Sequence, residues 1–115
     1  MPPLHSVDQH FSRSEPNVRQ AYDRIVAAAR KFGNVGEDPK KTSIHLVRST
    51  AFAGVATRKQ ALILTIKSPG DVKSPRVVKR EQTSAHRWHI EVRVEKPADI
   101  DKELVGWLEK AYSMS

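Results

Sequence analysis

The chain has 115 residues, with 20 Lys and Arg against 13 Asp and Glu, and it contains no cysteine. This length suits a single domain, and the lack of cysteine excludes disulfides, thiolate metal ligands and cysteine nucleophiles. No apolar run is long enough for a signal-peptide core or a membrane span, so we expect a bacterial-type cytoplasmic protein that does not associate with membranes.

The net charge of +7 is unevenly distributed. Residues 1–40 carry six basic and five acidic side chains, a net charge of +1. Residues 41–93 carry eleven basic and three acidic side chains (+8), and residues 94–115 carry three basic and five acidic ones (−2). A basic surface attracts nucleic acid, phosphate or an acidic protein. It can equally be a solvated face that only keeps a protein soluble.

Residues 1–13 show no clear period and begin with two prolines, so we expect a loosely ordered N-terminal arm. Residues 14–115 then form the single domain. Ser14 as N-cap, Pro16 in the first turn and Gly33 as a stop predict the first helix. Its apolar residues recur at spacings of three and four and form one buried stripe: Val18, Ala21, Tyr22, Ile25, Val26, Ala29 and Phe32.

Beyond residue 35 the hydrophobic period changes from that of a helix to that of a strand. Gly54 lies inside one predicted strand and indicates a bulge or a close approach of two backbones. Short connections favour antiparallel neighbours. The alternating segments are residues 43–48, 51–57, 61–67, 76–82 and 86–94.

The chain is predicted to end in a second helix, which Asp99 or Asp101 can cap. Gly106 inside this helix indicates close packing against the first helix or the sheet, because glycine otherwise weakens a helix. The predicted fold class is α+β: an antiparallel four- to five-stranded sheet with an N-terminal and a C-terminal helix packed on one face. The buried stripe of the second helix comprises Ile100, Leu104, Trp107, Leu108 and Ala111.

Three segments give the chain a family resemblance. Residues 52–55, followed by Arg58-Lys59 and the apolar strand 62–66, resemble a bacterial family of uncharacterised domains. The ending from Asp99 to Tyr112 and the opening with Phe11 fit the same family. Its members occur alone or C-terminal to other uncharacterised or nuclease-like modules. The resemblance implies the α+β order of elements, and it implies no activity and no cofactor.

The histidines do not predict a metal site. His86 and His89 are three residues apart in a predicted strand, and such residues point to opposite faces. We expect His86 on the inward face with Trp88, and His89 on the outward face. A structural or catalytic metal needs three or more converging ligands.

No catalytic motif is present either. The sequence has no nucleophile elbow and no glycine-rich phosphate loop. A metal-dependent nuclease needs clustered carboxylates, whereas residues 41–93 contain only Asp71, Glu81 and Glu91. We therefore expect no cofactor, and a non-catalytic role ahead of an enzymatic one.

The basic middle segment is the remaining candidate site. Alternation puts Lys67, His89 and Arg93 on one sheet face with His45, while large rings such as Trp88 fall on core faces. The lack of exposed rings argues against a base-stacking platform and leaves phosphate-backbone binding open. The candidate anion-binding or partner-binding residues are Lys41, His45, Arg48, Arg58, Lys59, Lys67, Arg80, Arg87, His89 and Arg93.

These observations leave three hypotheses open. The first is a non-catalytic binding module whose basic sheet region meets an anionic partner, either nucleic acid or an acidic protein. The second is a small-ligand or enzymatic domain with a pocket between sheet and helices, which partial exposure of Phe52, Gly54 and Arg58 would favour. The third is a self-associating accessory domain, for example a homodimer.

Overall fold

The structure is a computed structural model, and it describes residues 6–115. The predicted N-terminal arm therefore lies partly outside the described residues. Within them, Val7–His10 form the short helix α1, whose first turn is capped by the Ser6 hydroxyl. Phe11 follows directly and is buried, with its ring centroid 4.9 Å from that of Tyr22.

Helix α2 spans Pro16–Arg30, and its predicted apolar stripe is buried from Val18 to Ala29. Phe32, the last predicted member, lies beyond the helix and is part-exposed. The expected N-cap was wrong by one residue: Glu15 occupies the cap position and makes no side-chain capping bond. The Ser14 hydroxyl instead donates a 2.7 Å hydrogen bond to the carbonyl of Arg58, and so ties the start of α2 to a turn of the sheet. Gly33 lies two residues beyond the C-cap Lys31, so it is not the left-handed cap expected, but its positive φ of 151° is a conformation that favours glycine.

One antiparallel sheet follows, and over residues 6–115 it has six strands rather than the four or five expected. The additional strand contains Gly36 and Pro39, two residue types depleted in strands, and it lies at an edge. The strand order is β1-β2-β3-β4-β6-β5. The strands are β1 (Gly36–Pro39), β2 (Ile44–Val47), β3 (Ala51–Thr57), β4 (Leu62–Ser68), β5 (Val77–Ser84) and β6 (Arg87–Val94).

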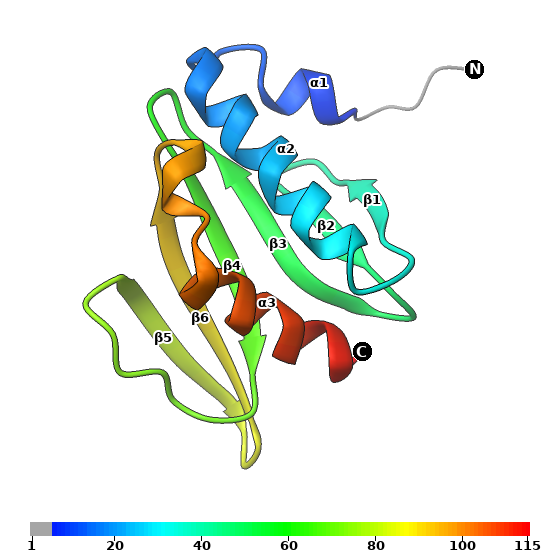
Figure 1. Cartoon of the computed structure of the whole chain (residues 1–115), viewed down its shortest axis with the longest axis vertical. Coiled ribbons are helices and arrows are strands. Elements are labelled where there is room, and N and C mark those ends of the chain that lie inside the picture. The colour runs from blue at the N-terminus through cyan, green and yellow to red at the C-terminus, as the bar shows by residue number, and fades with distance from the viewer. Residues whose placement is uncertain (1–5) are drawn as a thin grey trace.

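Helices α2 and α3 (Lys102–Ser113) lie side by side on one face of the sheet (Figure 1). The core forms between these two layers, because β4 alternates buried and part-exposed residues and turns Leu62, Leu64 and Ile66 toward the helices. Within residues 6–115 the opposite face carries no helix, and it is called the open face below (Figure 1).

Of the two predicted capping carboxylates, Asp101 is the N-cap of α3. Asp99 ends a short 3₁₀ turn (Pro97–Asp99) and accepts from the N–H of Glu95, while Asp101 accepts from the N–H of Leu104. This backbone bond, together with the Arg76 guanidinium 2.8 Å away, lowers the pKa of Asp101.

Two sequence expectations need correction here. Gly106 does not permit close packing, because it is exposed and a Cβ added there would have no atom within 4 Å. His86 is not on an inward strand face, because it lies exposed in the turn between β5 and β6. The strand β6 begins only at Arg87, and within residues 6–115 no side chain packs against α3 at Gly106.

A β-bulge in β3 shapes the open face. Leu46 pairs with Ala53, but the next pair is Val47 with Ala51, so Phe52 is an extra residue in its strand. Phe52 and Ala53 are consequently both buried, which breaks the alternation. The Phe52 ring packs edge-on against Tyr112 of α3, with 5.4 Å between centroids.

Candidate functional site

One row of residues crosses the middle of the open face. The register places His45 opposite Gly54, Gly54 opposite Thr65, and Thr65 opposite Glu91. Residues directly opposite in antiparallel strands project from the same face. All four are part-exposed, while their neighbours along each strand are buried.

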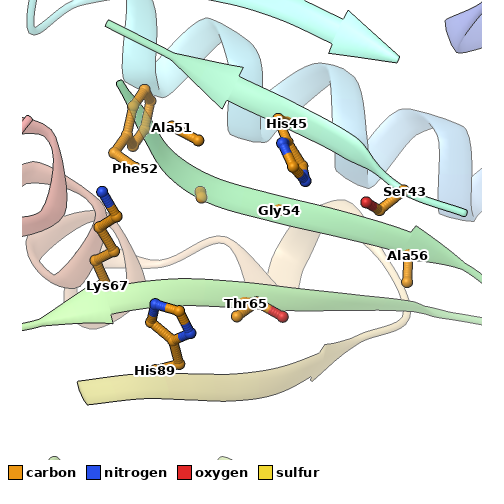
Figure 2. Close-up of a pocket in the computed structure, with 10 residues that line it drawn as sticks. Ser43, His45, Ala51, Phe52, Gly54, Ala56, Thr65, Lys67 and His89 are labelled. Atoms are coloured by element: carbon orange, nitrogen blue, oxygen red, sulfur yellow. The ribbon is translucent and has the colours of Figure 1, made fainter. Parts of the chain in front are cut away.

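A hollow of about 260 Å³ lies in this row, above Gly54 (Figure 2). Three features of β3 create it. Gly54 has no side chain, Ala56 has only a methyl group, and the bulge buries Phe52 against Tyr112. The floor of the hollow is therefore the backbone of β3 and a few small side chains.

Polar side chains surround this floor on several sides (Figure 2). His45 and Ser43 extend from β2 and the turn before it on one side, and Thr65 lies on the other side in β4. Lys67 stands at the end near Ala51. His89 reaches the hollow from β6. Polar side chains from β2, β4 and β6 and from the turn before β2 thus enclose the hollow.

Lys67 and His89 are direct cross-strand neighbours on β4 and β6. Their Cβ atoms are therefore separated by roughly 5 Å, and both side chains can contact one ligand group. Lys67 contributes three N–H donors and a positive charge. Among the described residues no carboxylate lines the hollow, so its charge complements an anion.

The nearest acidic groups lie toward strand β5, outside the hollow. Glu91 has its Oε2 3.8 Å from the Nζ of Lys79, which lies opposite it in the sheet. Glu81 lies opposite His89 and is exposed. The open face is therefore electrically mixed at the β5 edge and positive around Lys67.

Two further predicted residues share the open face with the hollow but do not line it. Arg93 lies opposite Ile63, and its Nε is 3.0 Å from Glu95 Oε1. Arg87 is two residues before His89 in β6, exposed, next to the β5–β6 turn. Arg87 extends the positive region from the hollow toward that end of the sheet.

Two predicted residues are held on the helix side. Arg48 donates a 3.2 Å hydrogen bond to the carbonyl of Tyr112 and lies 4.6 Å from its ring centroid. Arg80 lies opposite the buried Ile90, and its Nε is 2.9 Å from Asp71 Oδ1. These guanidinium groups bind the protein's own atoms and face away from the hollow.

The remaining three predicted residues, Lys41, Arg58 and Lys59, are exposed in turns. Lys41 lies in the β1–β2 turn, and the other two lie in the β3–β4 turn. Of the ten candidates, the structure thus brings His45, Lys67 and His89 together. The other seven cations are dispersed among the turns, the helix side and the margins of the open face.

The hollow itself was not predicted, although one signal for it was present. Gly54 inside an alternating strand indicates a missing side chain, and Ala56 two residues later is on the same face. Ser43 and Thr65 completed the lining without being named as site residues. Phe52 is turned away from the hollow by a bulge that only the pairing of β2 with β3 reveals.

A second hollow, of about 350 Å³, lies between the end of the sheet and α3. Ser68, Ile90, Trp107 and Lys110 line it together with the β4–β5 connection. This hollow lies between sheet and helix, but it includes none of Phe52, Gly54 and Arg58, whose partial exposure would have favoured such a pocket. Of these three residues, Phe52 is fully buried.

In residues 6–115, no three His, Cys, Asp or Glu side chains are grouped so that they could hold a metal ion. No helix in this same range has the length and apolar character needed to span a bilayer.

Comparison with known proteins places the chain in a family. No significant match was found among curated proteins or among solved structures. The sequence model of one family, described as "Domain of unknown function (DUF5655)", matches residues 7–115, which include the helices α2 and α3 and the whole sheet. The chain therefore belongs to the DUF5655 family of domains of unknown function.

Proposed function

We propose that this domain is a non-catalytic binding module that receives an anionic partner on the open face of its sheet. The observation that carries the proposal is the grouping of Lys67, His89 and His45 around a hollow lined by no carboxylate among the described residues. A compact anion would gain charge-assisted hydrogen bonds there. It would meet little competition from the protein's own acids.

Nucleic acid is the partner that the site favours over an acidic protein. Arg87 and His89 lie two residues apart on the same face of β6, and Lys67 stands beside His89, so cationic and hydrogen-bonding groups follow one line toward the hollow. Groups two apart in a strand are separated by roughly 6.6 Å. A line of this kind can follow a phosphate backbone.

The cellular setting belongs to the same proposal. A chain without cysteine fits a reducing compartment, and the cytoplasm of a bacterium is such a compartment and contains nucleic acid.

Binding to mixed-sequence DNA and RNA at about 50 and 200 mM salt tests the proposal, because phosphate contacts weaken steeply with salt. We expect Lys67→Ala to weaken binding and to lower the salt slope by about one. Lys59→Ala is the matched control: it removes the same charge from an exposed turn residue outside the hollow. Lys59→Ala should leave binding near the wild-type level.

The results separate the alternatives. Equal losses from the two variants would show that binding follows net charge and not this site. No binding to DNA or RNA at 50 mM salt would overturn the nucleic-acid version. Binding of an acidic polypeptide under those conditions would then identify the partner as protein.

The hollow beside Trp107 and Lys110 supports a second candidate function, the small-ligand pocket between sheet and helices. A ligand there would shift the indole signal of Trp107 in an NMR titration and leave Gly54 unaffected. The absence of any such shift across a metabolite library would remove this candidate.

A further inference from the structure

The hollow above Gly54 has the shape of a binding site for a flat ring. Its two sides, His45 on β2 and Thr65 on β4, are each one strand away from Gly54 on β3. Two strand spacings give a width of roughly 10 Å between backbones. The missing side chain at Gly54 and the methyl group of Ala56 leave the floor low and apolar, so a planar group can lie against the sheet.

The sides of the hollow supply the groups that a heterocyclic base needs. The imidazole of His45 borders the floor: a Cβ built on Gly54 would lie 3.9 Å from its Cδ2 atom, which is van der Waals distance. Histidine is one of the side chains on which bases stack. The hydroxyls of Thr65 and Ser43 can each donate and accept, which suits ring nitrogens and carbonyl oxygens.

The charged end of the same hollow suits a phosphate. Lys67 and His89 stand next to each other on adjacent strands, at the end of the hollow near Ala51 (Figure 2). One ligand that spans the hollow would thus meet a flat apolar floor, hydrogen-bonding sides and an end that carries the charge of Lys67. The floor and the sides suit a base, and the charged end suits a phosphate.

We propose that the hollow binds one nucleotide, with its base on Gly54 between His45 and Thr65 and its phosphate at Lys67 and His89. This inference rests on the proposed function and adds the ligand class to it. The nucleotide can come from a single strand or be a free mononucleotide. A base in a duplex is stacked and paired and cannot enter a hollow of this size, so duplex binding would use the cations alone.

The first experiment is an NMR titration of the full chain with a nucleoside 5′-monophosphate. Controls are the nucleoside, which lacks the phosphate, and ribose 5-phosphate, which lacks the base. We expect the monophosphate to shift the Gly54 amide and the ring signals of His45 and His89, and to bind at least tenfold more tightly than either control. Ribose 5-phosphate binding as well as the complete nucleotide would overturn the inference, because the base would then contribute nothing.

The second experiment fills the hollow without changing charge. Gly54 has no positive φ, so Gly54→Leu suits the backbone and places a side chain where the base would lie, while Gly54→Ala is the milder matched variant. At about 50 mM salt we expect the wild type to bind a single-stranded oligonucleotide tenfold more tightly than the duplex. Gly54→Leu should abolish this preference and leave duplex binding unchanged.

The outcomes separate the inference from the function on which it rests. If Gly54→Leu leaves single-strand binding intact while Lys67→Ala weakens it, the nucleotide site is wrong and the anion-binding module stands. If mononucleotides bind at the hollow and oligonucleotides do not bind at all, the nucleotide site stands and the nucleic-acid function falls. The titration of the wild type keeps the test valid should Gly54→Leu not fold.

Discussion

The hydroxyl of Tyr22 in α2 donates a 2.6 Å hydrogen bond to Oε1 of Glu37 in β1. Arg30, further along α2, has its Nη2 atom 3.4 Å from Oε2, the other carboxylate oxygen of Glu37. The bond joins α2 to β1, the edge strand whose neighbour in the described sheet is β2. Burial of the ring, and then this bond to Glu37, raise the pKa of Tyr22.

Replacing Tyr22 by Phe removes this hydrogen bond and keeps the buried ring. Because the acceptor is a carboxylate and is partly exposed, we expect a loss of about 1–2 kcal/mol in the free energy of unfolding. Urea denaturation measures it. A variant as stable as the wild type would show that Glu37 finds equivalent partners in water.

The raised pKa of Tyr22 also predicts a pH dependence in alkali. In the unfolded chain this phenol loses its proton near pH 10, whereas in the folded state it keeps the proton to higher pH. The contribution to stability is complete below pH 10 and is lost as the pH rises further, because only the unfolded state releases the proton. Between pH 9.5 and 11, wild-type stability should fall more steeply than that of Tyr22→Phe.

Gly33→Ala should be strongly destabilising. The φ of Gly33 is 151°, a conformation that side-chain-bearing residues rarely adopt, and a Cβ there would collide with the Tyr112 hydroxyl. Strain of this kind costs of order 1–3 kcal/mol. Gly70→Ala is the control, since Gly70 has open space around it and no positive φ. Equal thermal melting of both variants would contradict the prediction.

Gly106→Ala should have the opposite effect. Gly106 lies in the interior of α3, is exposed, and has no atom within 4 Å of an added Cβ. Alanine should therefore raise the free energy of unfolding by about 1 kcal/mol through helix propensity alone. A destabilised Gly106→Ala variant would mean that the outer surface of α3 is packed against something in solution.

Arg48 should behave as a structural residue and not as an anion ligand. Its guanidinium lies 4.6 Å from the Tyr112 ring centroid and binds the Tyr112 carbonyl. We expect Arg48→Ala to lower stability by about 0.5–1 kcal/mol and to leave nucleic-acid binding unchanged. Parallel urea and binding measurements check this. If Arg48→Ala lost nucleic-acid binding and kept the wild-type stability, Arg48 would have to be counted among the binding residues.

The sequence predicted the elements whose signal is repeated along the chain. The stripe of α2, from Val18 to Ala29, recurs over about three turns, and β4 alternates over seven residues. The short edge strand β1 was not predicted, because Gly36 and Pro39 are poor strand residues and only pairing with β2 makes them one. Ser14 was misplaced as a cap because its hydroxyl has a distant partner, the carbonyl of Arg58.

By itself, then, the sequence determined the α+β class, the core residues of α2, β4 and α3, and the outward placement of Lys67, His89 and His45. These follow from local periods, since burial of apolar area selects one face of each helix and strand. Tertiary structure alone decided the bulge that buries Phe52, the hollow that it leaves above Gly54, and the capture of Arg48 and Arg80 by the protein's own atoms. The physical reason is that register and cross-strand contacts join residues far apart in the chain, which no local period encodes.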